Sequence, residues 1–164
     1  MLPPSLTRLH ILDYVNVMLP RIPSSVRHVI LSDPFDENPI DFHLLPTTVE
    51  SLRVKLFKTE GIRFPPHIRN LRVDHGLMLA EIETLPQSIT SLDISIGLSH
   101  NVILRDKWPE FLVELNCRVM FNVNLHLIRF LQELPLSLTK LSLYYGDRLI
   151  VPRKSWIDHL TNLV

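Results

Sequence analysis

The side chains in this sequence best suited to chemistry are a single cysteine, Cys117, and eight histidines. A thiolate is a nucleophile, and an imidazole acts as a base or a metal ligand. Cys117 occupies a position where equivalent segments carry Ile11, Val54 and Ile94, so we expect it to be a buried packing residue. No two histidines have the short spacing of metal ligands, and no cysteine cluster accompanies them. The sequence therefore predicts no metal site.

Two further site types are disfavoured. The four glycines are isolated, so no glycine-rich loop is present to hold a phosphate. Asp33, Asp36 and Glu37 lie close to Asn38, but their order matches no calcium-binding loop and favours a solvated turn. We therefore expect no catalytic residues, no cofactor and no enzymatic activity.

The dominant pattern is a unit that recurs along the chain. Each copy has an apolar residue, a proline, two mostly small or polar residues, and then the pattern apolar-x-x-apolar-x-apolar. Seven copies have their anchor proline at positions 3, 23, 46, 65, 86, 109 and 135. A repeat of this length is typical of a solenoid, in which each unit buries its apolar face against its neighbours. Proline suits the extended entry to a strand because it fixes φ and has no N–H.

The last two apolar residues of each unit alternate with polar ones, which is the period of a strand with one buried face. The apolar triplets are Leu6, Leu9 and Ile11; Val26, Val29 and Leu31; Val49, Leu52 and Val54; Ile68, Leu71 and Val73; Ile89, Leu92 and Ile94; Leu112, Leu115 and Cys117; and Leu138, Leu141 and Leu143. We predict one repeat domain over 1–164, a solenoid with a curved parallel β-sheet on its concave side. The convex side should be mostly loop and extended chain.

Two segments depart from this plan. Residues 122–133 lack proline and glycine and space their apolar residues as a helix does, so a short helix is expected. Leu160–Leu163 echoes Leu138–Leu141, which predicts a partial eighth unit. Alternatively, Ser155 and Asp158 form a capping box that opens a terminal helix. Neither end leaves room for a cap, so we expect either a fragment or a sheet edge offered to a partner.

In its recurrent Leu-Pro-x-Ser-[Leu/Ile/Val]-x-x-Leu-x-[Ile/Val/Leu] unit the chain resembles the leucine-rich repeats, and more narrowly the FNIP-type repeats of amoebae and of giant viruses. Phe35–Ile40 resembles the segment that gives these repeats their name, with one extra residue. Proteins with such repeats often carry an F-box, so the resemblance implies substrate recognition for a ubiquitin ligase. The asparagine or cysteine column of common leucine-rich repeats is missing here, so other groups must satisfy the turns.

Charge and hydropathy set further limits. The net charge is zero, so no global field attracts nucleic acid or an anionic membrane. No apolar run approaches the roughly 20 residues that span a bilayer, and the amino terminus lacks the pattern of a signal peptide. A single cysteine fits a reducing compartment. We expect a cytoplasmic protein, with a nuclear location also open.

The remaining candidate for function is the concave face of the sheet. Arg53, Lys55 and Arg72 are expected to form a basic patch, followed by an acidic strip of Asp74, Asp93 and Glu114. Arginine and tyrosine are enriched at binding hot spots, so Tyr144 joins the predicted partner-binding residues. The alternative is that these charges keep the sheet soluble and support it laterally.

These observations favour a non-catalytic protein-binding module that acts through its concave face. The alternative is a structural component of a larger assembly, contacted through solenoid ends or convex loops, with self-association through uncapped ends. The acidic strip interrupts any continuous basic stripe, which argues against nucleic acid.

Overall fold

The computed structural model describes most of the chain, and the strands predicted from the repeat all lie within the described part. The described residues are 2–12, 21–32, 42, 45–55, 63–78, 84–97, 107–119, 124–146 and 148–163. Most linking segments, including the acidic loop at 33–38, the FNIP-like segment and much of the convex side, lie outside these residues.

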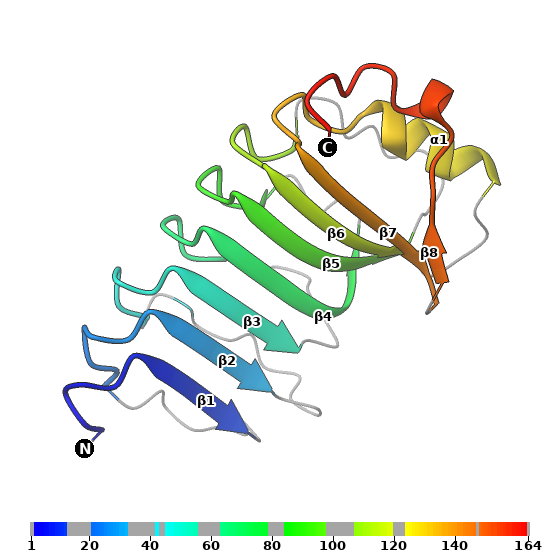
Figure 1. Ribbon diagram of the computed structural model, residues 1–164. Helices are drawn as coiled ribbons and strands as arrows, with labels where there is room; N and C mark the ends of the chain where they lie inside the picture. Colours follow the sequence, from blue (N-terminus) through cyan, green and yellow to red (C-terminus); the bar gives the residue numbers. More distant parts are fainter. Residues whose placement is uncertain are drawn as a thin grey trace.

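The fold is a solenoid built on one eight-stranded sheet whose strands follow one another in chain order (Figure 1). The first seven strands are parallel, and the eighth is antiparallel to the seventh. The strands are β1 (Arg8–Leu12), β2 (His28–Ser32), β3 (Ser51–Lys55), β4 (Asn70–Met78), β5 (Ser91–Gly97), β6 (Glu114–Val119), β7 (Lys140–Tyr145) and β8 (Arg148–Ile150). The predicted repeat solenoid is confirmed.

The register of the parallel strands matches the alignment of the repeats. The second apolar position forms the paired column Leu9, Val29, Leu52, Leu71, Leu92, Leu115 and Leu141. The third forms the column Ile11, Leu31, Val54, Val73, Ile94, Cys117 and Leu143. Equivalent residues of neighbouring units therefore lie side by side, so repeat position predicts spatial neighbours.

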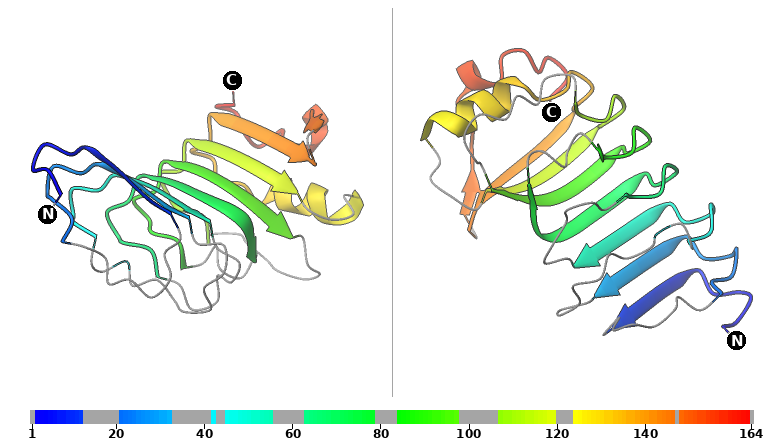
Figure 2. Two further views of the ribbon diagram at one scale, coloured as in Figure 1. Left: turned by 90° about the horizontal axis from the view of Figure 1, so that it is seen from below. Right: turned by 180° about the vertical axis from the view of Figure 1, so that it is seen from behind.

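The sheet is curved, and its hollow side is the face seen in Figure 1, as the view from below shows (Figure 2). The two chain ends lie at opposite ends of the sheet. The apolar columns point to the other side, where the central members are buried; Val54, Ile94 and Leu115, for example, are fully inaccessible. Polar alternate residues remain on the concave side, which makes that side the face able to vary.

The seven anchor prolines have the same structural role, which is to close the turn before each strand. In each of the seven units the proline carbonyl accepts a hydrogen bond from the N–H three residues later, over 3.0–3.3 Å. That N–H belongs to the first apolar residue of the unit, for example Leu6, Ile89 or Leu138. The proline therefore closes a tight turn directly before the strand, where its missing N–H leaves no ladder bond unmade.

A column of hydroxyl groups stabilises these turns in place of the missing asparagine column. In four of the seven units the residue two after the anchor proline is a serine or threonine that donates a hydrogen bond to a backbone carbonyl of the preceding unit, over 2.7–3.1 Å. The bonds are Ser25 to Leu6, Thr48 to Val26, Ser88 to Ile68 and Ser137 to Leu112. Each bond satisfies a carbonyl that would otherwise be partly buried without a partner. We call this column the hydroxyl ladder.

The predicted helix is confirmed as α1 (Asn124–Gln132). Leu127, Phe130 and Leu131 are buried in the core, and the ring of Phe130 packs edge-on against Trp108 with centroids 5.7 Å apart. The helix lies on the convex side, near the C-terminal end of the sheet (Figure 2). It covers apolar surface that a short linking segment would leave open.

The C-terminal end differs from the expectation in two ways. The eighth strand of the sheet, β8, comes from the segment before the echo and not from the echo itself. The capping-box helix is also wrong, because a single 3₁₀ turn, η3 (Lys154–Trp156), forms without a side-chain cap. The eighth unit nevertheless makes its turn, with the N–H of Leu160 donating to the carbonyl of Ile157 over 2.8 Å. Ile157 thus replaces the anchor proline, and Leu160 is buried.

The N-terminal end of the sheet is more open. Among the described strands, β1 pairs only with β2, and Leu6, Leu9 and Ile11 are half-buried where their equivalents in central units are buried. The end of the array at β1 therefore leaves part of an apolar layer accessible.

Candidate functional site

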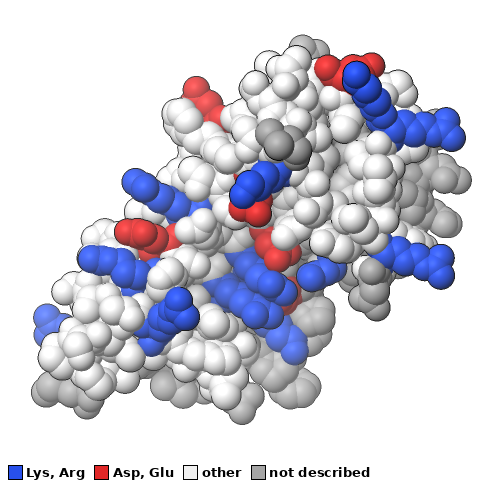
Figure 3. Space-filling view, in the orientation of Figure 1, with Lys and Arg blue, Asp and Glu red and all other residues white. Residues whose placement is uncertain are grey.

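The concave face carries more positive than negative charge, although the whole chain is neutral. Three outward-facing residues alternate with the buried ones on each strand from β1 to β7. Six of these outward residues are basic: Arg8, Arg53, Lys55, Arg72, Arg118 and Lys140. Three are acidic: Asp74, Asp93 and Glu114. The face therefore has an excess of three positive charges with histidine neutral, and opposite charges adjoin in its middle (Figure 3).

Five charged side chains form a continuous row of ion pairs across the centre of this face. Asp74 accepts hydrogen bonds from the Nε atoms of Arg53 at 2.6 Å and Arg72 at 2.9 Å, one on each oxygen. A terminal nitrogen of Arg72 lies 3.3 Å from Asp93, whose other oxygen is 4.0 Å from Arg118. We call Arg53, Asp74, Arg72, Asp93 and Arg118 the charged row. It joins four strands, β3 to β6.

An irregularity in β4 positions Asp74 between its two arginines. Val73 pairs with Ile94, but the next pair joins Leu77 to Ile96, so three residues of β4 stand opposite one of β5. Such bulges bend a strand and redirect side chains. Asp74 is the first residue of the bulge, and on its other side it pairs with Lys55 of β3. Because of the bulge, Asp74 is not paired with a residue of β5.

The pKa shifts in the row agree with its geometry. Burial disfavours the charge on Asp74, but hydrogen bonds from Arg72 and Arg53 outweigh it, so the pKa of Asp74 lies below its usual value. The hydrogen bond to Asp74 raises the pKa of Arg72 despite some burial, and the charges of Asp93 and Asp74 add to this. Asp74 and Arg72, at the centre of the row, are therefore both ionised at neutral pH.

We expect Asp74→Asn to destabilise the protein at neutral pH but much less in acid. Because the folded pKa of Asp74 is lowered, its stabilisation is complete above the unfolded pKa and is lost as the pH falls through the folded value. Pairs this exposed contribute below about 1 kcal/mol. Urea denaturation of both proteins at pH 7, 5 and 3 measures the effect. An equal difference in free energy of unfolding at pH 3 and pH 7 would contradict this assignment.

The structure brings together four of the seven predicted partner-binding residues: Arg53, Arg72, Asp74 and Asp93. The expected separate basic patch and acidic strip are interleaved, as lateral charge support requires. Lys55, Glu114 and Tyr144 face the same side but make no ion pair with a described residue. Sequence reasoning left out Arg118, although its register opposite Ser95 places it diagonal to Asp93.

A hollow of about 350 Å³ lies on the concave face beside the charged row. Its charged lining comes from four strands: Arg8 of β1, Arg53 of β3, Arg72 of β4 and Asp93 of β5. Between them, small or amide side chains such as Ser51 and Asn70 leave the space open. The hollow therefore has three guanidinium groups and one carboxylate.

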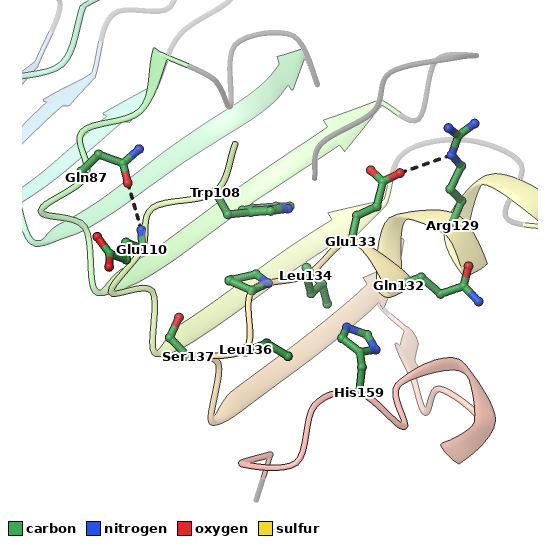
Figure 4. A pocket seen from close by; sticks show the side chains of 11 residues that line it. Gln87, Trp108, Glu110, Arg129, Gln132, Glu133, Leu134, Leu136, Ser137 and His159 are labelled. Carbon is green, nitrogen blue, oxygen red and sulfur yellow. Dashed lines mark hydrogen bonds and ion pairs between the residues drawn. The ribbon is translucent and has the colours of Figure 1, made fainter. Parts of the chain in front are cut away.

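A second cavity, of about 980 Å³, lies at the turn edge near the C-terminal end of the sheet. It is bounded by α1, by the turns before β6 and β7, and by the tail residue His159 (Figure 4). Glu133 pairs with Arg129 at 3.3 Å, and the side chain of Gln87 accepts from the backbone N–H of Glu110 at 2.9 Å. Charged and amide side chains thus line the cavity together with apolar ones such as Trp108 and Leu134.

This second cavity contains the residue types of a catalytic triad, Ser137, His159 and Glu133, but not their geometry. The hydroxyl of Ser137 donates to the carbonyl of Leu112 at 2.7 Å, as a rung of the hydroxyl ladder. The Nε2 atom of His159 is buried without a partner, whereas a triad requires a hydrogen bond between base and nucleophile. Ser137 and His159 are neighbours because they hold the same position in successive units. From the sequence, the histidines were considered only as metal ligands, so this proximity was not predicted.

Cys117 is a core residue, as predicted. It is fully inaccessible in its apolar column, and burial, together with the charge of Asp93, raises the pKa of its thiol. A thiol that stays protonated is a poor nucleophile. Cys117 therefore contributes packing.

Metal ligands and membrane-spanning helices are both missing from the described residues. No group of three or more histidine, cysteine, aspartate or glutamate side chains among them is placed to hold a metal ion. In the same part of the chain, no helix is long and apolar enough to cross a membrane.

Comparison of the chain with family models, curated proteins and solved structures finds no match to any of the three. The resemblance to FNIP-type leucine-rich repeats therefore stays a prediction from the repeat unit.

Proposed function

We propose that the protein is a non-catalytic binding module that holds a protein partner on the concave face of its sheet. The observation that supports this most directly is the charged row, in which ion pairs tie five side chains to four neighbouring strands. Side chains already held in place lose little entropy on binding. The positive excess of the face favours a partner segment with negative charge.

The test is selection from a displayed library of protein fragments, followed by calorimetry with the selected fragment. We expect the double charge reversal Arg53→Glu and Arg72→Glu to abolish binding. The matched control is Arg63→Glu and Lys154→Glu, which changes net charge equally at exposed residues outside the strands. Thermal unfolding of the control variant should remain close to that of the unchanged protein. The concave-face variant loses the ion pairs to Asp74 and Asp93 and should unfold at a somewhat lower temperature, so its binding is measured well below that temperature. Undiminished binding by the concave-face variant would refute the proposal.

Within this proposal, the bound protein can be a substrate presented to a ubiquitin ligase. The support is the resemblance to FNIP-type repeats, which often accompany an F-box. Ubiquitination of a selected partner in cells should rise with expression of the protein and should not rise with the Arg53→Glu and Arg72→Glu variant. Equal ubiquitination with both proteins would contradict the ligase role, without contradicting the proposal that the concave face binds a protein.

A structural role is the second candidate, favoured by the open edge of β1. Among the described strands, β1 pairs only with β2, and its own residues Leu9 and Ile11, with Leu6 just before them, are half-buried. Exposed strand edges readily pair with other chains. Sedimentation at increasing concentration should then show self-association that Ile11→Lys prevents. The convex loops, the other predicted contact of this role, lie outside the described residues.

A further inference from the structure

We infer that the hollow on the concave face is an anion site for an acidic side chain of an extended protein segment, with Asp74 as the residue that orients its arginines. This inference rests on the proposed function and names the chemistry of the partner. Glutamate, aspartate and phosphoserine share that chemistry, and matched peptides can distinguish carboxylate from phosphate.

The balance of charge at the hollow favours an anion. Arg8, Arg53 and Arg72 line it, and Asp93 is the one carboxylate among its described lining residues. His28 adds an imidazole from β2. An anion placed here meets three cations from three strands, whereas a cation meets mostly repulsion.

Two of the guanidinium groups are held in a fixed orientation. Asp74 does not line the hollow, yet its oxygens accept from the Nε atoms of Arg53 at 2.6 Å and Arg72 at 2.9 Å. Each guanidinium is planar with five N–H donors, so a bond at Nε fixes its plane and leaves the terminal amino groups for other acceptors. Arg72 gives one of these to Asp93. The terminal groups of Arg53 have no acceptor among the described residues.

The donors are accessible, and the hollow is large enough for an acidic group. The side chain of Arg53 is 45% exposed and that of Arg72 is 37% exposed, against 18% for Asp74. The donors therefore face solvent while the orienting carboxylate is largely covered. A hollow of about 350 Å³ admits a carboxylate or phosphate with part of its chain, and paired arginines suit either group.

The observations favour a protein segment over a nucleic acid. Single-stranded nucleic acids are held by aromatic side chains that stack on bases, interleaved with basic ones. None of the described outward residues of β1 to β6 is phenylalanine, tyrosine or tryptophan; their only rings are the imidazoles of His10 and His28. Asp93 and Asp74 also interrupt the positive charge. Binding of an oligonucleotide is therefore an outcome of the test that would count against the inference.

The probes are three peptides with the same glycine-serine frame and a central Glu-Gly-Glu, phosphoserine or Gln-Gly-Gln, with oligothymidine as a fourth. Titration is followed by the Nε–H signals of Arg53 and Arg72 in NMR spectra of the full chain. We expect saturable shifts with an acidic peptide and none with the glutamine peptide. The tighter of the two acidic peptides identifies carboxylate or phosphate. Tighter binding of oligothymidine, or no shift with either acidic peptide, would overturn the inference.

Variants then separate orientation from simple attraction. Arg53→Ala and Arg72→Ala should each weaken binding by roughly ten- to a hundredfold, the effect of losing hydrogen bonds to a charged group. Asp74→Asn is decisive because it removes a negative charge beside the site. Simple attraction predicts tighter binding, whereas loss of orientation predicts weaker binding, which we expect. Arg63→Ala is the control and should leave binding unchanged.

Failure here is distinguishable from failure of the proposed function. If library-selected fragments need Arg53 and Arg72 but are not acidic, the anion site is wrong. If Asp74→Asn tightens their binding, the orienting role of Asp74 is wrong. In both cases the concave-face module stands. If selected fragments bind independently of Arg53 and Arg72, the proposed function fails as well.

Discussion

Replacing Leu92 with alanine is expected to lower the free energy of unfolding by about 2–5 kcal/mol, the usual cost of truncating a buried leucine. Leu92 is 1% exposed in the middle of its apolar column, between Leu71 and Leu115. The cost combines lost burial with a cavity that two rigid neighbouring strands cannot close. Urea denaturation followed by circular dichroism measures it.

The matched control for this substitution is Leu136→Ala. Leu136 is 64% exposed, so the same change should alter the free energy of unfolding by less than about 0.5 kcal/mol. In a solenoid each unit contacts only its neighbours, and Leu92 lies in a central one. Equal effects of the two substitutions would show that the apolar column does not form the core.

The path of the chain through the sheet could be predicted because one rule repeats. Leu52, Leu71 and Leu92 hold the same position in successive units, and the structure pairs them directly. Alternation then determines which neighbours face outward. The same rule placed Cys117 in the core. The helix α1 was predicted separately, from a segment without proline or glycine whose apolar residues have helical spacing. Because the pattern recurs in seven units, the alignment of each unit could be compared with that of the others.

Four of the five members of the charged row were predicted from the sequence, but their pairing was not. Arg53, Arg72 and Asp93 follow from strand alternation, whereas the bulge that releases Asp74 depends on the length of β4 relative to β5. No local sequence pattern predicts the extra residues of β4 that form the bulge. A patch and a strip were therefore expected where the structure has interleaved ion pairs.

The C-terminal end shows where a single-position rule misleads. The repeat was aligned on its proline, so the eighth unit seemed to have lost its anchor. The turn itself needs only a carbonyl at that position, and Ile157 supplies one to Leu160. β8 forms instead from the preceding segment and closes the sheet edge beside β7, an antiparallel pairing that no repeat position encodes.

The hydroxyl ladder leads to the second large effect, a loss of about 1–3 kcal/mol in the free energy of unfolding for Ser88→Ala. The hydroxyl of Ser88 donates to the carbonyl of Ile68 at 2.7 Å, and its removal leaves a part-buried acceptor unpaired. Ser5→Ala is the matched control, because Ser5 holds the same repeat position but is exposed and has no preceding described unit to bond. Its effect should stay below about 0.5 kcal/mol.

The ladder also predicts a stabilising substitution. His67 holds the ladder position of the fourth unit, and its Nε2 atom is buried without a partner. In His67→Ser the hydroxyl takes the place that Ser88 has one unit later and reaches the carbonyl of Val49, as the register of neighbouring units requires. We expect a gain of about 1 kcal/mol, since one hydrogen bond forms and one orphaned polar atom disappears. Urea denaturation of His67→Ser, and of its combination with Ser88→Ala, measures both effects. A loss of stability in His67→Ser would show that the histidine ring packs in a way that the ladder does not explain.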